Sequence, residues 1–352
     1  MIDSEAKLRL LLTTTRRPEY APPWLPRTVV TKLALGPLPV GDIRHLVQAR
    51  LSVEALPEVL ARRVTEKAEG NPLFAEEIAS YLTERGILRI TAGKLQFDAN
   101  AATSALPASV QGVLTARVDR LAPHDRAVLQ AASVIGRQFD PILLAAAVGE
   151  TDVDARLASM QALDLIHSGV SGDYVFKHAL VRDALYHSLL TQARKALHLK
   201  IAEEIERRSG NRLAEVAEIL AHHYSQTDHA NKAFDYLSMA GSKSLNVYSL
   251  DEASVHFTAA LALIDENPDF TSDDQLADFL VPYALLLNIT LRTSAAIDVL
   301  TRYLSRTDRL GDDSRVVLIR HHYVWALVWG GALSKSGGPT ARNIANGEPA
   351  RR

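Results

Sequence analysis

The sequence contains no cysteine, which excludes disulfide bonds, thiolate metal sites and a cysteine nucleophile. It also lacks any run that approaches the roughly 18 apolar residues of a membrane-spanning helix. Its charges nearly cancel, with 39 Lys and Arg against 41 Asp and Glu, so no overall field favours nucleic acid or anionic lipid. The first twenty residues place acids where an export signal has bases. We therefore expect a cytoplasmic protein that does not span a membrane.

What is present begins with a short apolar run over residues 8–14, which is typical of a strand buried on both faces of a parallel sheet. Arg16, Arg17 and Pro18 close this run. Such a strand needs neighbours, yet the next 150 or so residues show no strand–helix–strand alternation. We expect the chain to be the back part of a longer protein, cut inside an α/β domain.

A helical pattern follows from residue 41 onward, with apolar residues on one face of each segment. The stops between the helices are well marked. Gly70 can end one helix in the left-handed conformation, Asn71 can cap the next helix, and Pro72 can occupy its first position. The helices are expected over 41–51, 57–69 and 72–85, with a hairpin or loop over 87–104.

Three further helices followed by a hairpin suggest a winged-helix domain. Apolar stripes predict helices over 107–121, 123–135 and 152–165. The segments LIHSG, VSGD and YVFKH then offer two short β segments around a glycine-rich turn. One long helix, from Ala179 to Arg208, is expected to leave this unit.

From Leu213 to about Leu327 the pattern is helical throughout. Small residues alternate with large ones at the spacing of tetratricopeptide helix pairs. Two of the small residues, Ala233 and Ala253, are 20 residues apart and not roughly 34, so the helix at 230–248 must serve two pairings. One further pair is expected between Tyr283 and Tyr303. The packing alanines are Ala233, Ala240, Ala253 and Ala260.

Five segments, in order along the chain, resemble the signal-transducing STAND ATPases of bacteria. They are LLLTTTRRPEY, AEGNPLFAEEIASYLTERGIL, LPASVQGVLTARVDRL, VLQAASVIGRQFD and YVFKHALVRDALYHSLL. The likeness covers residues 8 to about 265. The sequence is similar in particular to the ATPase and tetratricopeptide part of proteins that begin with a class III adenylate or guanylate cyclase domain. It is also similar to large LuxR-type regulators. In that family a P-loop core binds ATP or ADP, a helical lid and a winged helix close over it, and a helical repeat array reads a signal.

The sequence departs from the family pattern in its catalytic core. It contains no G-x-x-x-x-G-K-[ST] motif and no apolar strand that ends in the acidic pair expected to hold Mg²⁺. The resemblance therefore implies only the last strand of the core, the lid, the winged helix and the repeats. We expect ATP or ADP to be the cofactor of the parent protein, with weak or absent binding in this chain and no hydrolysis by this chain alone.

The resemblance implies nucleotide-binding roles for five residues. Arg17 would be the sensor arginine that reaches the γ-phosphate, a task that suits a planar guanidinium. The turn formed by Gly70, Asn71 and Pro72 would pack on the adenine ring, with Pro72 as the apolar contact. His178 would approach the β-phosphate of bound ADP. Each position also has a structural interpretation: a solvated basic residue, a helix stop with its cap, and a histidine satisfied at a strand end.

The other candidate sites argue against DNA contact, metal binding and catalysis. The helix that would enter a major groove, 152–165, carries three aspartates against a lone Arg156, and acids repel phosphate. The pairs His222–His223 and His321–His322 are adjacent on helices, where neighbouring side chains point about 100° apart and cannot share one metal. No catalytic constellation is recognisable, so an enzymatic role is not expected for this chain by itself.

The sequence thus predicts a mainly α protein, with a helical lid, a winged helix and a tetratricopeptide-like α-solenoid. Its function would be that of a truncated regulatory segment of a STAND-type, cyclase-associated ATPase. Two alternatives stay open: a tetratricopeptide adaptor with a vestigial nucleotide site, and a fragment of a LuxR-type transcriptional regulator. Expected partners are proteins bound by the repeats, including a cyclase or other output domain in the full-length protein. The expected domains are a P-loop core remnant (1–35), the lid (36–104), the winged helix (105–180), a connecting long helix (181–212), the repeats (213–333) and a disordered tail (334–352).

Overall fold

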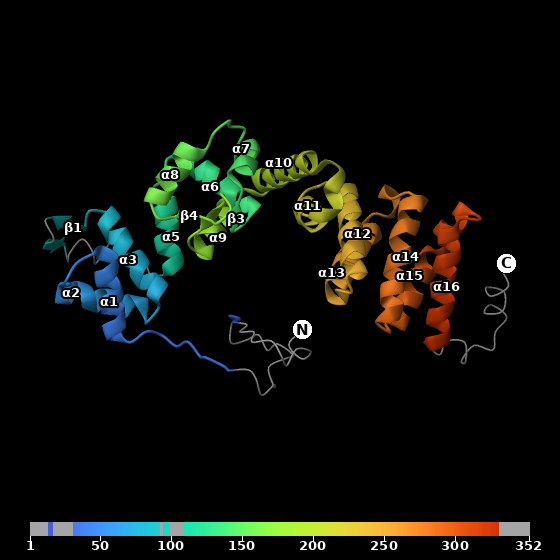
Figure 1. Cartoon of the computed structure of the whole chain (residues 1–352), viewed down its shortest axis with the longest axis horizontal. Helices are drawn as coiled ribbons and strands as arrows, with labels where there is room; N and C mark the ends of the chain where they lie inside the picture. The colour runs from blue at the N-terminus through green and yellow to red at the C-terminus, as the bar shows by residue number, and fades with distance from the viewer. Residues whose placement is uncertain (1–12, 17–30, 92–93, 99–108, 331–352) are drawn as a thin grey trace. The chain divides into compact units, whose positions relative to one another are not determined.

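The computed structural model describes residues 13–16, 31–91, 94–98 and 109–330. The chain divides into two compact units, Met1–Ala108 and Ser109–Arg352, and each is described by itself. Both are built mainly from helices (Figure 1), as the sequence predicts. Of the apolar run expected as a strand, residues 8–12 lie outside the described residues, while Thr13 and Thr14 are exposed and have no regular secondary structure. The predicted tail, 334–352, also lies outside the described residues.

The first unit contains three helices and a hairpin. Helices α1 (Val40–Leu51) and α2 (Glu58–Ala68) both pack against α3 (Pro72–Glu84), within one or two residues of the expected bounds. Strands β1 (Leu88–Thr91) and β2 (Lys94–Phe97) pair antiparallel, with Leu88 opposite Phe97, so the expected hairpin is confirmed. Helices α1 and α2 each bury one face, whereas α3 is buried on most of its sides. The buried side chains include Ile43, Val47, Leu60, Val64, Phe74, Ile78 and Leu82.

The second unit begins with a sheet-bearing region, residues 109–188. Its strands β3 (Gln138–Phe139), β4 (Ile166–Ser168) and β5 (Tyr174–Phe176) form an antiparallel sheet in the order β3–β5–β4. The β4–β5 hairpin was expected, whereas β3 was not. The Phe139 and Phe176 rings, 5.4 Å apart, place the sheet against the core. The helices are α5 (Val110–Val118), α6 (Pro123–Ile135), α7 (Pro141–Val148), α8 (Asp154–Ala162) and α9 (Ala179–Ser188).

Helix α7 is missing from the sequence prediction, although its ends carry ordinary signals. Asp140 caps it by accepting a hydrogen bond from the Ile142 N–H (2.9 Å), Pro141 is its first residue, and Gly149 ends it in the left-handed conformation. Its eight residues, PILLAAAV, are all apolar and therefore show no helical periodicity.

The long helix expected from Ala179 to Arg208 is two helices, which corrects that prediction. Leu189 and Leu190 adopt extended backbone angles between α9 and α10 (Thr191–Ser209). A 3₁₀ segment, Gly210–Val216, then follows in place of further α-helix. The break separates the sheet-bearing region from the helices that come after it.

The remaining helices form the repeat array, residues 217–329. Helix α12 packs against both α11 and α13, so the prediction that one helix serves two pairings is confirmed. Helices α12, α14 and α16 also pack side by side in one layer, and α14–α15 is the further pair expected around Tyr283 and Tyr303. The helices are α11 (Ala217–Tyr224), α12 (Ala230–Asn246), α13 (Leu250–Glu266), α14 (Asp273–Ile289), α15 (Thr293–Thr307) and α16 (Ser314–Trp329), visible in order in Figure 1.

Close helix contacts in the array depend on small residues. The four packing alanines are at most 1% exposed. A Cβ atom at Gly241 would lie 2.7 Å from the Phe257 ring, so this glycine lets α12 and α13 approach each other. Among the described residues, no helix has both the length and the apolar character needed to cross a bilayer.

Candidate functional site

The turn between α2 and α3 has the conformation that its sequence predicts. Glu69 and Gly70 both have positive φ angles, 48° and 77°. The Asn71 side chain accepts a hydrogen bond from the Phe74 N–H (3.2 Å), and Pro72 is the first residue of α3. Asn71 and Pro72 are exposed, so the proline ring is available for an apolar contact. The stop, cap and start interpretation is confirmed; contact with an adenine ring stays a prediction.

Gly70 is also where the chain that enters this unit is attached. The Leu38 N–H donates to the Gly70 carbonyl oxygen at 2.8 Å. A Cβ atom on Gly70 would lie 2.5 Å from the Pro37 Cβ and 2.9 Å from the Leu38 oxygen. Any larger residue would therefore displace the entering segment, in addition to straining the left-handed backbone. The turn therefore packs closely against the residues that precede α1 and is hydrogen-bonded to them.

The other two predicted nucleotide contacts, Arg17 and His178, lie outside the part of the first unit that the structure describes. Arg17 lies outside the described residues. His178 belongs to the second unit, where it is half-buried, directly precedes α9, and accepts a hydrogen bond from the Val181 N–H with its carbonyl oxygen (3.1 Å). The roles of both residues stay predictions.

The helix considered for DNA contact, α8, has its basic residue engaged elsewhere. The Arg156 guanidinium donates to Asp125 (3.1 Å) and to Glu150 (3.2 Å). Its charge is therefore balanced by two carboxylates that belong to the protein itself. This geometry adds to the electrostatic argument against phosphate contact by this helix.

A buried histidine contact joins α10 to α11 and was missed at the sequence level. The Nδ1 atoms of His198 and His223 lie 2.9 Å apart, and His198 Nε2 lies 3.0 Å from the Tyr186 hydroxyl. Both histidines are at most 2% exposed. Burial lowers the pKa of His198 to about 4 and that of His223 to about 3, and the charge of His222 acts in the same direction on both. The two rings are neutral, with one Nδ1 donating to the other.

The histidine contact involves two ring nitrogens, one from each of two helices. Within the described ranges, no group of three His, Cys, Asp or Glu side chains is arranged to hold an ion. From the sequence, His222 and His223 were considered together because they are adjacent. In the structure, the hydrogen-bonding partner of His223 is His198, from the preceding helix. The sequence does contain one sign of this contact, since His198 is a polar residue among the apolar positions of α10.

A second polar network connects α10 to α11 and α12. The Glu206 carboxylate accepts hydrogen bonds from Lys232 (2.7 Å), from the Tyr224 hydroxyl (2.7 Å) and from the Tyr236 hydroxyl. Burial acts to raise the pKa of Glu206, but these donors outweigh it and the pKa is lowered. The Tyr224 and Tyr236 rings stack with centroids 5.5 Å apart. The Glu206 carboxylate thus connects α10 to the first helices of the array, and the stacked tyrosines connect α11 to α12.

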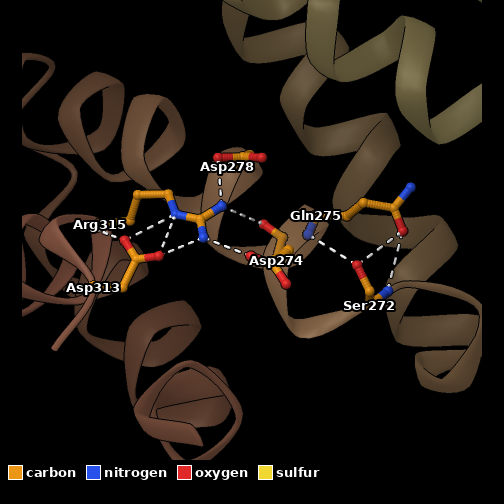
Figure 2. Close-up of polar contacts among 6 residues, drawn as sticks. All are labelled: Ser272, Asp274, Gln275, Asp278, Asp313 and Arg315. Carbon is orange, nitrogen blue, oxygen red and sulfur yellow. Dashed lines mark hydrogen bonds and ion pairs between the residues drawn. The ribbon is translucent and has the colours of Figure 1, made fainter. Parts of the chain in front are cut away.

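Figure 2 shows the corresponding contact at the other end of the array, centred on Arg315 of α16. Its guanidinium donates to Asp274 (2.6 Å) and Asp278 (2.9 Å) of α14, and to Asp313, the residue that caps α16. Three carboxylates therefore surround one cation, which leaves a local excess of negative charge. Ser272 and Gln275 form a capping box beside it that starts α14.

The chain is similar to a family model and to a longer curated protein. Residues 41–95 match the family model of a domain of unknown function, DUF8739. An uncharacterized protein of Rhizobium meliloti (strain 1021), R02095, is 28% identical over 268 residues, which is 73% of this chain and 25% of that protein. The chain thus spans about a quarter of the length of the curated relative that it matches.

One similar solved structure is the Signal Transduction ATPase with Numerous Domains (STAND) protein with a tetratricopeptide repeat sensor, PH0952, from Pyrococcus horikoshii. It shares 11% sequence identity, with a TM-score of 0.33, and the comparison covers 88% of this chain and 54% of that one.

Proposed function

We propose that this chain is a regulatory segment of a STAND-type nucleotide switch, in which a lid senses the nucleotide and a repeat array binds proteins. The observation that carries the proposal is the turn of Gly70, Asn71 and Pro72. It presents an exposed proline ring on a capped turn that is hydrogen-bonded to the entering chain at Leu38. Such a turn can contact a flat apolar base and transmit the contact to the residues before α1.

The sheet-bearing region would be the winged helix of this switch. Its three-stranded antiparallel sheet and its helices support this assignment, and the engaged Arg156 favours a protein-facing role over DNA binding. The repeat array would bind a protein partner, with a cyclase or another output domain of the full-length protein as candidates. We also propose a cytoplasmic location for the protein.

A second function, that of a tetratricopeptide adaptor with a vestigial nucleotide site, is favoured by one specific observation. The sequence has no G-x-x-x-x-G-K-[ST] loop to cradle the phosphates. For the same reason we expect no ATP turnover by the purified chain, because neither the phosphate loop nor a Mg²⁺-positioning carboxylate pair is recognisable. Steady phosphate release that survives repurification and is lost in Arg17→Ala would contradict this expectation.

Titration with a fluorescent ADP analogue distinguishes the two functions. The switch predicts saturable binding that Pro72→Ala weakens, because alanine keeps the helix start but removes the ring. Pro57→Ala removes a proline ring from the N-cap of α2 in the same unit; this control should bind as the wild type does. The absence of saturable binding at millimolar analogue would reject the switch and leave the adaptor.

A further inference from the structure

The solvent-facing side of α14 has an unusual division of its surface. Asp274 and Asp278 lie in its first half, and their side chains are 66% and 68% exposed. Leu285 and Ile289 lie in its second half and are 39% and 44% exposed. At 100° per residue, these four residues fall within about 60° of one another around the helix. One helix face is thus acidic at its start and apolar at its end.

The neighbouring face of α16 continues the apolar part. Leu318 and Trp329 are 46% and 67% exposed, and they lie on the same side of α16 as Arg315, which faces α14. The Trp329 ring lies 5.6 Å from that of Trp325. Helices α14 and α16 are parallel neighbours, because Arg315 reaches the start of α14 while Asn288, near its end, donates to the His322 carbonyl oxygen (3.0 Å). We call these residues the docking face: Asp274, Asp278, Leu285, Ile289, Leu318 and Trp329.

Charge determines what can cover such a face. Between residues 213 and 330 the sequence has eight Lys and Arg against sixteen Asp and Glu, although the whole chain is nearly neutral. Arg315 is shared among three carboxylates, so the acidic end of the docking face keeps an excess of negative charge (Figure 2). Anionic lipid and nucleic acid would be repelled, whereas a cationic protein segment would be attracted.

We infer that the docking face binds an amphipathic helix of a partner protein, with apolar residues on one side and Lys or Arg near one end. Its apolar residues would cover Leu285, Ile289 and Trp329, and its basic residues would meet Asp274 and Asp278. A helix fits because the face is itself a pair of parallel helices, onto which a third helix packs at about 8–10 Å. The inference rests on the proposed protein-binding role of the repeats and names the chemistry of the partner.

The test uses two synthetic 18-residue helical peptides with the same leucine face. One carries Lys at all other positions and its twin carries Glu. Dye-labelled Lys peptide should bind the full chain saturably, with an affinity that falls as salt rises. The Glu peptide should bind at least about tenfold more weakly. Equal affinities for the two peptides, or no binding of the Lys peptide, would overturn the inference.

Substitutions in the chain test whether the Lys peptide binds at the docking face. Ile289→Ser should weaken the Lys peptide about tenfold or more, as expected for an apolar contact at the centre of an interface. Val255→Ser changes an apolar residue on α13 that is 67% exposed, against 44% for Ile289, and this control should change nothing. Asp274→Asn with Asp278→Asn should weaken binding by about threefold to tenfold and flatten the salt dependence, against Asp251→Asn on α13 as control. Equal losses in Ile289→Ser and Val255→Ser would place the binding elsewhere and reject the docking face.

Two further measurements separate a loss of peptide binding from a loss of stability, and peptide binding from lipid binding. Asp274 and Asp278 also hold Arg315, so the melting temperature of that double variant is measured, and the Ile289→Ser result stands independently of it. Vesicles of phosphatidylcholine with phosphatidylserine should not bind the chain, and binding of vesicles in preference to the Lys peptide would overturn the inference. The ADP titration on the same samples tests the switch alone, so failure of the docking face and failure of the proposed switch are distinguishable.

Discussion

The sheet-bearing region and the repeat array both bury large apolar side chains, but alanine makes a larger share of the core of the array. The first fills its core with large side chains from elements far apart in the sequence, such as Leu129, Leu144 and Phe176. The second lets successive helices approach each other through alanines and Gly241, with aromatic rings such as Phe257 filling the remaining space. The difference teaches that the first region should be sensitive to lost volume, and the second to added volume.

The largest expected effect is a loss of volume in the sheet-bearing region. Leu144 is fully buried on α7. The substitution Leu144→Ala should lower the free energy of unfolding by about 2–5 kcal/mol, because the neighbouring residues cannot close the resulting cavity completely. The free energy of unfolding in urea measures this. Ile142→Ala, on the same helix but exposed, is the control. A cost for Leu144→Ala no greater than that of the control would contradict the assigned core.

The next effect is an addition of volume in the array. Ala253→Leu should cost about 1–3 kcal/mol, because this fully buried position of α13 has no space for a larger side chain. Val255→Leu adds volume to an exposed position of the same helix and should be neutral within about 0.5 kcal/mol. The free energies of unfolding of Ala253→Leu and Val255→Leu, measured in urea, test this expectation. Tolerance of leucine at both positions would remove the distinction between the two regions.

A pH effect belongs to the junction between the regions. The pKa values of His198 and His223 in the folded protein, about 4 and about 3, lie below the ordinary value of 6.5. The unfolded chain therefore binds more protons at mildly acidic pH, so these residues stabilise the fold above about pH 6.5, and that stability is lost as the pH falls toward 4. Urea unfolding at pH 7, 6 and 5 should show this loss. His198→Gln with His223→Gln should reduce the slope, whereas exposed His321→Gln should keep it.

The smallest effect should be the same in both regions. Ser109 caps α5 and Ser272 caps α14, each accepting a backbone N–H hydrogen bond at 3.1 Å. Each Ser→Ala change should cost about 1 kcal/mol, since a cap satisfies the same backbone group in either context. Melting temperatures of the two variants provide the comparison. A several-fold difference between them would mean that the regions differ in helix-end stability as well as in core packing.

Much of the array and of the first unit could be predicted from sequence because their contacts are local. Helices that pack on their neighbours carry their periodicity and their stops within the chain, as Gly70, Asn71 and Pro72 illustrate. The two-residue strand β3 could not be predicted, because its pairing with Tyr174 and Val175 depends on residues about 35 positions away. The break at Leu189 and Leu190 was hidden because leucine is a good helix former and only tertiary packing interrupts it there.

The candidate site was predictable only in part, for a related reason. The capped turn is a local feature, and its conformation followed from three consecutive residues. The His198–His223 contact is not local, because it joins two helices through positions 25 residues apart. Histidines of this kind look like surface residues in a sequence, since only burial by the neighbouring helix makes them neutral and paired.

The parallel packing of α12, α14 and α16 has an electrical consequence. Each helix carries a dipole with its positive pole at the start, where Asp273, Asp274 and Asp313 supply negative charge. The opposite poles lie together along the other edge, and neither α14 nor α16 has a basic residue in its last turn there. The helices that follow α12 and α14 in the chain, α13 and α15, run the other way, so their dipoles oppose those of this layer. The attraction of cations is therefore limited to the last turns of α14 and α16, and salt weakens it further.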